Sequence, residues 1–138
     1  MKKFKGNGIL GGMIPGSAIK FYDMLINKYF EREKNLNYPE IIIFSVNFEK
    51  ILKVQKSNNI KSYIKELSNG LKSLYKAGAD FVVIPSNTSH IVFKDLKKNS
   101  KIPILSIVEK TAIKAPNDGL KNLLLLGTKL IMQSSSYG

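Results

Sequence analysis

The 138-residue sequence has no cysteine, and it contains one histidine and one arginine. Without cysteine the chain can form no disulfide, no thiolate zinc site and no thiol nucleophile, so any catalysis must use other side chains. No apolar run approaches the length that crosses a bilayer, and the first residues do not have the pattern of a signal peptide. We therefore expect a soluble, cytoplasmic protein with no membrane partner.

The formal net charge of +12 invites a nucleic-acid reading, because lysine and arginine neutralise phosphates. Arg32 is the only arginine among the 22 basic residues, however, and recognition of phosphates and bases favours the guanidinium fork. The lysines are spread from Lys2 to Lys129. We interpret them as a solvated surface that could steer anionic substrates such as dicarboxylates, and we do not expect nucleic acid as the partner.

Short apolar runs alternate with segments of helical periodicity, which predicts a parallel sheet covered by helices. The strands are expected at residues 8–10, 40–46, 81–85, 102–106 and 122–126. Helices are expected between Gly12 and Asn35, at 60–77, at about 88–98 and at 108–115, and a further one begins at Gly127-Thr128. The length suits one α/β domain with a hydrophobic core.

Ligands of open parallel sheets bind beyond the carboxyl ends of the strands, which selects the loops at 11–13, 45–48, 86–90, 106–109 and 127–128. Four of these five loops carry small hydroxyl or amide side chains, or glycines with free backbone N–H groups. Such loops suit a small carboxylate ligand.

Several single residues have a structural reading beside a functional one. His90, four residues after Ser86, could activate a hydroxyl or make one structural hydrogen bond. Glu109 could be a general acid, but a carboxylate is also favoured in the first turn of a helix. Ser45 and Asn47 could be ordinary residues at the end of a strand.

Other motifs point away from cofactors. Residues 6–11 match G-x-G-x-x-G, but no strand can precede them, so we treat the match as accidental. Histidine and acidic residues show no metal-ligand spacing, and nothing marks a Schiff-base lysine. We expect no metal, no pyridoxal phosphate and no other cofactor.

Taken together, the motifs of this sequence resemble those of the aspartate/glutamate racemase family, especially its aspartate racemase-like branch. Residues 8–13 with Pro15, Phe21 and Tyr22 look like the opening G-I-L-G-G-M-x-P…F-Y. The most specific stretch is residues 77–90 (AGADFVVIPSNTSH), which resembles A-G-A-D-x-[IV]-V-I-x-C-N-T-x-H. The resemblance continues through Ser45-Val46-Asn47-Phe48 with Gln55, through residues 102–105, and through residues 125–128 with Met132 and Tyr137.

The resemblance implies two flavodoxin-like domains with the site between them, so residues 1–105 would form the first domain and 106–138 would begin a truncated second one. It implies a cofactor-independent, two-base racemisation of an amino acid such as Asp or Glu. In that reaction one residue removes the α-proton and a partner on the other domain returns a proton to the opposite face. Ser86 takes the catalytic position, and the substrate-binding positions are Met13, Ser45, Asn47, Gln55, Asn87, Thr88, Ser89 and Thr128.

The sequence departs from the family pattern in three ways. Ser86 stands at the usual first cysteine, although members with threonine there are known, and Ile14 and Ile131 replace residues that are usually small or hydroxyl-bearing. The half that carries the second cysteine is absent, so we expect the polypeptide to be inactive unless a second chain or a homodimer partner completes it. The alternatives are a non-catalytic module that binds dicarboxylic amino acids and, more weakly, a nucleic-acid-associated protein.

Overall fold

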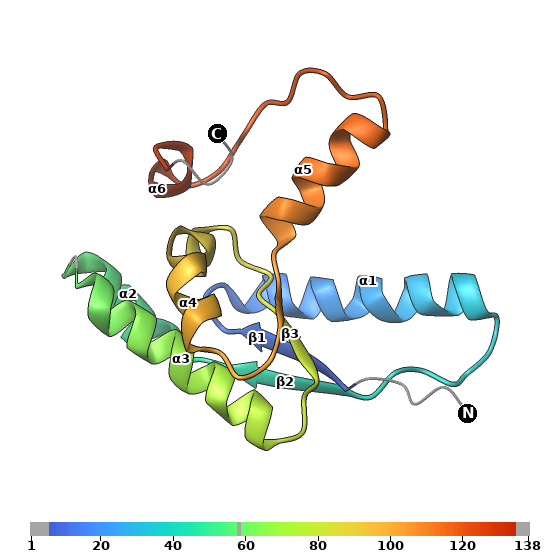
Figure 1. The fold of residues 1–138 in the computed structure, drawn as a ribbon, viewed down its shortest axis with the longest axis horizontal. Coiled ribbons are helices and arrows are strands. Elements are labelled where there is room, and N and C mark those ends of the chain that lie inside the picture. The colour runs from blue at the N-terminus through green and yellow to red at the C-terminus, as the bar shows by residue number, and fades with distance from the viewer. Residues whose placement is uncertain (1–5, 58, 135–138) are drawn as a thin grey trace.

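The computed structural model describes residues 6–57 and 59–134. Four strands form a parallel sheet in the order β2-β1-β3-β4 (Figure 1). The strands are β1 (Asn7–Gly11), β2 (Ile41–Ser45), β3 (Phe81–Val83) and β4 (Ile104–Leu105). This order is the flavodoxin-like one, so the predicted α/β class is confirmed.

Six α-helices and one 3-10 helix are found in the described residues. They are α1 (Pro15–Glu33), α2 (Phe48–Lys56), α3 (Ile60–Lys76), the 3-10 helix η1 (Thr88–Val92), α4 (Phe93–Asn99), α5 (Ile107–Asn117) and α6 (Lys129–Met132). None of the helices in this part of the chain is both long and apolar enough to span a membrane.

Helices cover both faces of the sheet. Successive residues of a strand point to opposite faces, so two neighbouring residues of β1 show which helix lies on each side. A Cβ on Gly11 would meet Ala18 of α1, whereas Leu10 lies against Gly70 of α3. The α3 face holds the main core, in which Leu10 packs with buried residues of α3, η1 and α4. Gly70 is what lets α3 approach so closely, since a Cβ there would lie 2.5 Å from Leu10 Cδ1.

Local capping explains where the helices begin and end. The Asn59 side chain accepts from the Ser62 N–H at 3.0 Å and starts α3. At the other end, Gly78 has a φ of 96°, and Ala79 N–H donates to Leu74 O, which is the glycine-terminated Schellman arrangement. Gly119 ends α5 in the same way, with Leu120 N–H donating to Ala115 O.

The structure corrects several expected elements. Residues 122–126, expected as a fifth strand, are not a strand, because α5 carries the chain away from the edge strand β4 and leaves them without a partner. The sequence pattern did not predict α2, although Asn47 caps it and Glu49 lies in its first turn. The helix expected at 88–98 divides into η1 and α4.

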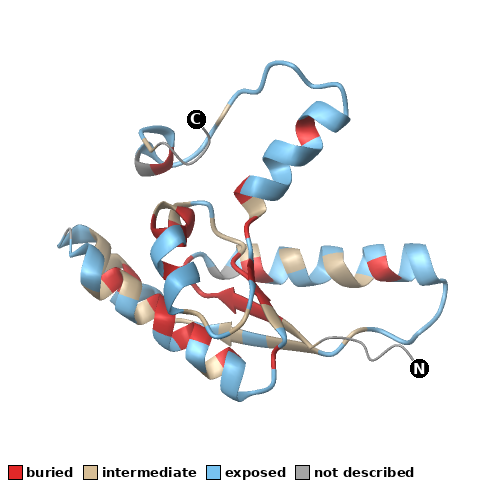
Figure 2. Cartoon of the chain, viewed as in Figure 1, coloured by how far each residue is buried: buried red, intermediate tan, exposed pale blue. Residues whose placement is uncertain are grey.

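The segment that follows α5 leaves large apolar side chains in solvent (Figure 2). Leu123, Leu124 and Leu126 are 63%, 84% and 77% exposed. Ile131 of α6 is in contrast buried, and α6 contacts η1. The chain beyond α5 is therefore less well covered than the sheet, and the domain boundary expected at residue 105 stays a prediction.

Candidate functional site

The carboxyl edge of the sheet brings the loops after β1, β2, β3 and β4 to one end of the molecule, because all four strands are parallel. Met13 follows β1, Asn47 follows β2, Ser86 follows β3 and Ser106 follows β4. This is the edge at which open α/β sheets bind ligands.

A buried hydroxyl cluster lies behind Ser86. Ser89 Oγ is 3.2 Å from Ser86 Oγ, 3.0 Å from Tyr63 OH and 2.8 Å from Met13 Sδ. Ser89 is completely buried and Met13 almost so. Burial raises the pKa of Tyr63, and hydrogen bonds with Ser89 and Gln55 partly oppose this shift. The Tyr63 hydroxyl therefore stays protonated at neutral pH.

His90 is held by backbone on both ring nitrogens. Its Nδ1 lies 2.8 Å from Ser86 O, and the Ile107 N–H donates to its Nε2 at 3.3 Å. These partners require a neutral ring with the proton on Nδ1, because Nε2 accepts and a carbonyl can only accept. Burial lowers the pKa of His90, while the Ser86 carbonyl and the Glu109 charge oppose that shift. His90 is thus a structural link between η1 and α5 rather than a base for the Ser86 hydroxyl.

A small cavity of about 120 Å³ adjoins the hydroxyl cluster through Tyr63. It is lined by Val54, Gln55, Asn59, Ile60, Tyr63, Thr88, Ile91 and Val92. Two of the predicted substrate-binding residues, Gln55 from α2 and Thr88 from η1, share this wall although they are far apart in sequence. Tyr63 was missed by sequence reasoning, because it reads as one more apolar position of the α3 stripe.

Other predicted residues have local roles in the structure. The Asn47 side chain accepts from the Lys50 N–H at 3.0 Å and caps α2, and the Thr128 hydroxyl caps α6. Ser45 is exposed, and its Oγ lies beside Gly12, whose φ of 91° forms the turn after β1. Asn87 is exposed at the start of η1. None of these four residues is among those that line the small cavity.

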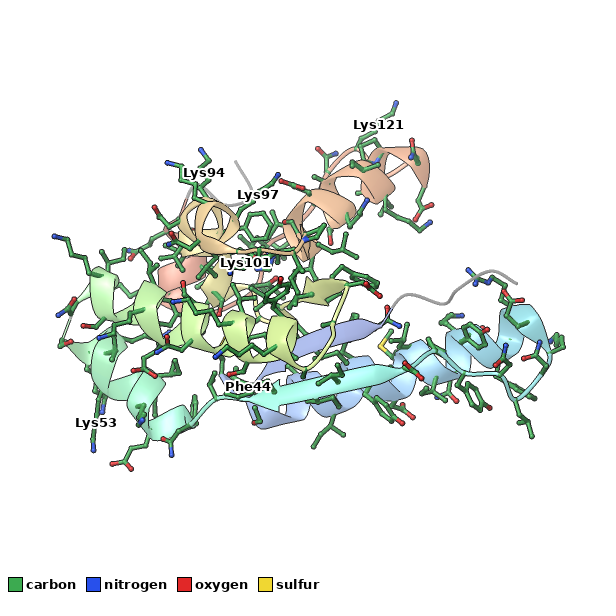
Figure 3. All side chains as sticks on the ribbon, turned by 60° about the horizontal axis from the view of Figure 1, so that its bottom comes forward. Phe44, Lys53, Lys94, Lys97, Lys101 and Lys121 are labelled. Carbon is green, nitrogen blue, oxygen red and sulfur yellow. The ribbon has the colours of Figure 1, made fainter. Side chains whose placement is uncertain are left out.

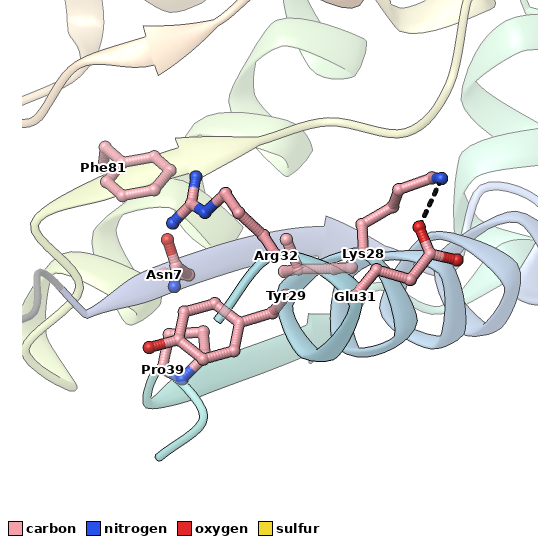
Figure 4. Close-up of a pocket in the computed structure, with 8 residues that line it drawn as sticks. Asn7, Lys28, Tyr29, Glu31, Arg32, Pro39 and Phe81 are labelled. Atoms are coloured by element: carbon pink, nitrogen blue, oxygen red, sulfur yellow. Dashed lines mark hydrogen bonds and ion pairs between the residues drawn. The ribbon is translucent and has the colours of Figure 1, made fainter. Parts of the chain in front are cut away.

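A larger cavity of about 640 Å³ lies at the opposite edge of the sheet (Figure 4). Asn7 and Phe81, the first residues of β1 and β3, line it together with Arg32 and the ion pair between Lys28 and Glu31. This cavity is at the amino ends of the strands, so it is separate from the Ser86 edge.

Lysine side chains lie on several sides of the described part of the chain. Figure 3 shows Lys53 of α2 and Lys121 beyond α5 extending away from the molecule on different sides. Within residues 6–57 and 59–134, no three histidine or acidic side chains come together to hold a metal ion.

The fold and the Ser86 edge define an open parallel α/β protein whose ligand loops suit a small, polar molecule. Comparison with known proteins gives the family. The model of the Asp/Glu/hydantoin racemase family matches residues 10–137, so the chain belongs to this family and the predicted resemblance is confirmed. The match includes Tyr137, which lies outside the described residues.

Three relatives illustrate the similarity. The broad specificity amino-acid racemase RacX of Bacillus subtilis is 30% identical over 133 residues, which are 94% of this chain and 57% of RacX. A candidate Asp/Glu racemase from Yersinia pestis has a TM-score of 0.88 at 32% identity, over 96% of this chain and 58% of that one. An aspartate racemase homologue from Pyrococcus horikoshii has a TM-score of 0.86 at 34% identity with the same coverage. The chain thus spans somewhat more than half the length of these relatives.

Proposed function

We propose that this chain supplies one half of a cofactor-independent amino-acid racemase site, with Ser86 as the group that faces the α-carbon of an Asp- or Glu-like substrate. The observation that carries the proposal is the position of Ser86 directly beyond β3, at the ligand edge, in a member of a racemase family. Racemisation needs one proton removed from the α-carbon and another returned to the opposite face. Ser86 serves one face, so the second face requires a group from another polypeptide segment.

The substrate carboxylates need hydrogen-bond donors, because a charge in a partly desolvated site is unfavourable unless protein groups compensate it. Thr88 offers a hydroxyl at the wall of the small cavity, and Asn87 stands beside Ser86 with an amide. We assign these two residues to carboxylate binding. The net charge of +12 favours the approach of a dicarboxylate.

A direct test is incubation with L-Asp and L-Glu in deuterated water. Deuterium at the α-carbon together with the D-isomer supports racemisation, and both should disappear in Ser86→Ala but persist in Ser73→Ala, whose hydroxyl bonds within α3. The outcome that rejects the proposal is an absence of exchange even after a polypeptide resembling the part of RacX beyond the matched region has been added.

A second candidate function is binding of dicarboxylic amino acids without turnover. It is favoured by the surroundings of Ser86, because the cluster beside its hydroxyl contains hydroxyls and a thioether but no base, and His90 is occupied by backbone. Calorimetry would then detect binding that Asn87→Ala abolishes, with no α-deuterium exchange. An absence of binding rejects this alternative.

We also propose that residues 106–138 begin a second α/β unit, and that this unit pairs with a polypeptide resembling the part of RacX beyond the matched region. Two observations support this partner: the exposed leucines at 123, 124 and 126, and an apolar hollow of about 530 Å³ that includes Phe21, Leu105, Ile107 and Leu123. Full burial of a leucine side chain contributes about 1.5–3 kcal/mol, so these residues favour a covered state.

The partner is tested by mixing the chain with the remaining part of RacX and measuring their association by calorimetry. Leu124→Lys should weaken it by about tenfold or more, since tenfold corresponds to about 1.4 kcal/mol. Leu36→Lys is the matched control, because Leu36 is 78% exposed before β2. Self-association of the chain alone, or no association at all, would overturn the assignment.

A further inference from the structure

Three hydroxyl groups from different parts of the fold meet at the Ser86 edge. Tyr63 comes from α3, Ser89 from η1 and Ser86 from the loop after β3. Their oxygens follow one another at 3.0 Å and 3.2 Å, with Ser89 in the middle. Since Ser89 is completely buried, water does not compete for its hydrogen bonds.

The direction of these hydrogen bonds follows from the available donors and acceptors. Tyr63 is protonated at neutral pH and can donate to Ser89 Oγ. When Tyr63 donates to it, Ser89 has one proton for two remaining acceptors, Met13 Sδ at 2.8 Å and Ser86 Oγ at 3.2 Å. A thioether sulfur is a weak acceptor, so the oxygen of Ser86 is favoured. Ser86 then receives a hydrogen bond from behind, and its own proton is directed outward.

We propose that Tyr63 and Ser89 are positioning residues that form a buried hydroxyl relay behind position 86 and stabilise negative charge on the side chain there. Consecutive hydroxyls in a chain polarise one another, which strengthens each bond in a low-dielectric interior. The relay makes Ser86 a better proton donor towards a ligand. The inference rests on the proposed function, because it concerns the group that the site presents to the substrate.

The absence of cysteine from the chain provides a clean probe of this charge. Ser86→Cys introduces one thiol at the end of the relay, and its pKa is measured from the pH dependence of its alkylation rate by iodoacetamide. A donor behind the sulfur stabilises the thiolate and lowers the thiol pKa. No amino acid is present in this titration, so its result is independent of whether the chain racemises anything.

Removing the relay should raise the thiol pKa. Adding Ser89→Ala to Ser86→Cys is expected to raise it by about one unit, and the alkylation rate at neutral pH should fall by up to about tenfold. Tyr63→Phe should raise the pKa by a smaller amount, because it acts through Ser89. Circular dichroism confirms that each variant is folded.

Two matched controls separate the relay from general effects of mutation. Ser68 of α3 is also a buried serine, but its Oγ has no hydrogen-bond partner among the described residues, so Ser68→Ala removes a buried hydroxyl outside the relay. Tyr75 lies on the same helix and is exposed, so Tyr75→Phe removes a tyrosine hydroxyl outside the relay. Neither change should move the thiol pKa.

The relay is overturned if Ser89→Ala changes the thiol pKa by less than about 0.2 unit, or if Ser68→Ala changes it equally. If Ser89→Ala does not fold, Tyr63→Phe decides: a raised thiol pKa supports the relay and an unchanged one rejects it. If Ser89→Ala raises the thiol pKa but the chain has no racemase activity, the relay is supported and the proposed function is rejected.

Discussion

His90 gives the sharpest stability prediction, because it is the only histidine of the chain and both its nitrogens are bound. His90→Phe keeps an aromatic ring that can stack on Phe93, as the imidazole does at a centroid distance of 5.1 Å. It leaves the Ser86 carbonyl and the Ile107 N–H without their partner. A fully buried group left unpaired costs about 1–3 kcal/mol. Since both hydrogen bonds are only partly buried, we expect a combined loss of no more than about 2–6 kcal/mol in the free energy of unfolding.

The pH dependence of unfolding tests the same arrangement independently. Burial lowers the pKa of His90 in the folded chain, so the unfolded chain binds more protons below the ordinary pKa of 6.5. The stability from neutral His90 is therefore fully present above pH 6.5 and is lost as pH falls from 6.5 through the lowered folded value. The slope in this window is at most about 1.4 kcal/mol per pH unit.

Urea unfolding at a series of pH values between 5 and 8 measures both effects. The wild-type midpoint should fall as the pH drops below 6.5, and His90→Phe should lose the histidine part of that slope. Nitrogen chemical shifts should report the Nδ1–H tautomer. A wild-type midpoint that is independent of pH across this range, or an unchanged slope in His90→Phe, would refute the reasoning.

Three further changes probe the frame of the site. Gly12→Ala forces a side chain onto a φ of 91° and brings Cβ within 2.3 Å of Val46 O, so unfolding measurements should show a loss of at least about 1–3 kcal/mol. Gly16→Ala is the control, because beyond the neighbouring residues and the backbone of its own helix no described atom lies within 4 Å of the new Cβ; equal stability of the two variants would contradict the prediction. Leu67→Ala opens the core beneath α3, where Leu67 is completely buried, and calorimetric unfolding should show a loss of about 2–5 kcal/mol; a smaller loss would mean that the core collapses around the gap. Asn59→Ala removes the α3 cap and should cost about 1 kcal/mol in a urea titration, whereas an unaffected midpoint would show that the cap hydrogen bond contributes nothing.

The parallel sheet could be predicted because it depends on local patterns. A few consecutive residues suffice to predict the apolar strands β1, β2 and β3 and the end of α3 at its glycine. The alternation of strands and helices then requires parallel pairing. Ser86 was assigned the catalytic position because residues 77–90 resemble a family motif, which is again a short-range signal, and its role stays a prediction.

The missed features depend on contacts between distant residues. Tyr63 looks apolar in its helix, and only the fold reveals that its hydroxyl reaches Ser89, 26 positions along the chain. The leucines of residues 122–126 have the composition of a buried strand, but a strand also needs a neighbour to pair with. The sequence alone could not decide between the two roles of His90, because one of its two hydrogen-bond partners is 17 residues away.

The position of β2 at the edge of the sheet has a consequence for handling the protein. Its sequence Ile41–Ser45 (IIIFS) contains no charge and no proline, and Ile43 is 47% exposed. Such an edge is a template for strand addition and aggregation. Pro39 and Glu40, immediately before the strand, are the residue types that act as gatekeepers against this. Replacing these two residues is expected to make concentrated solutions of the protein aggregate sooner without changing the fold.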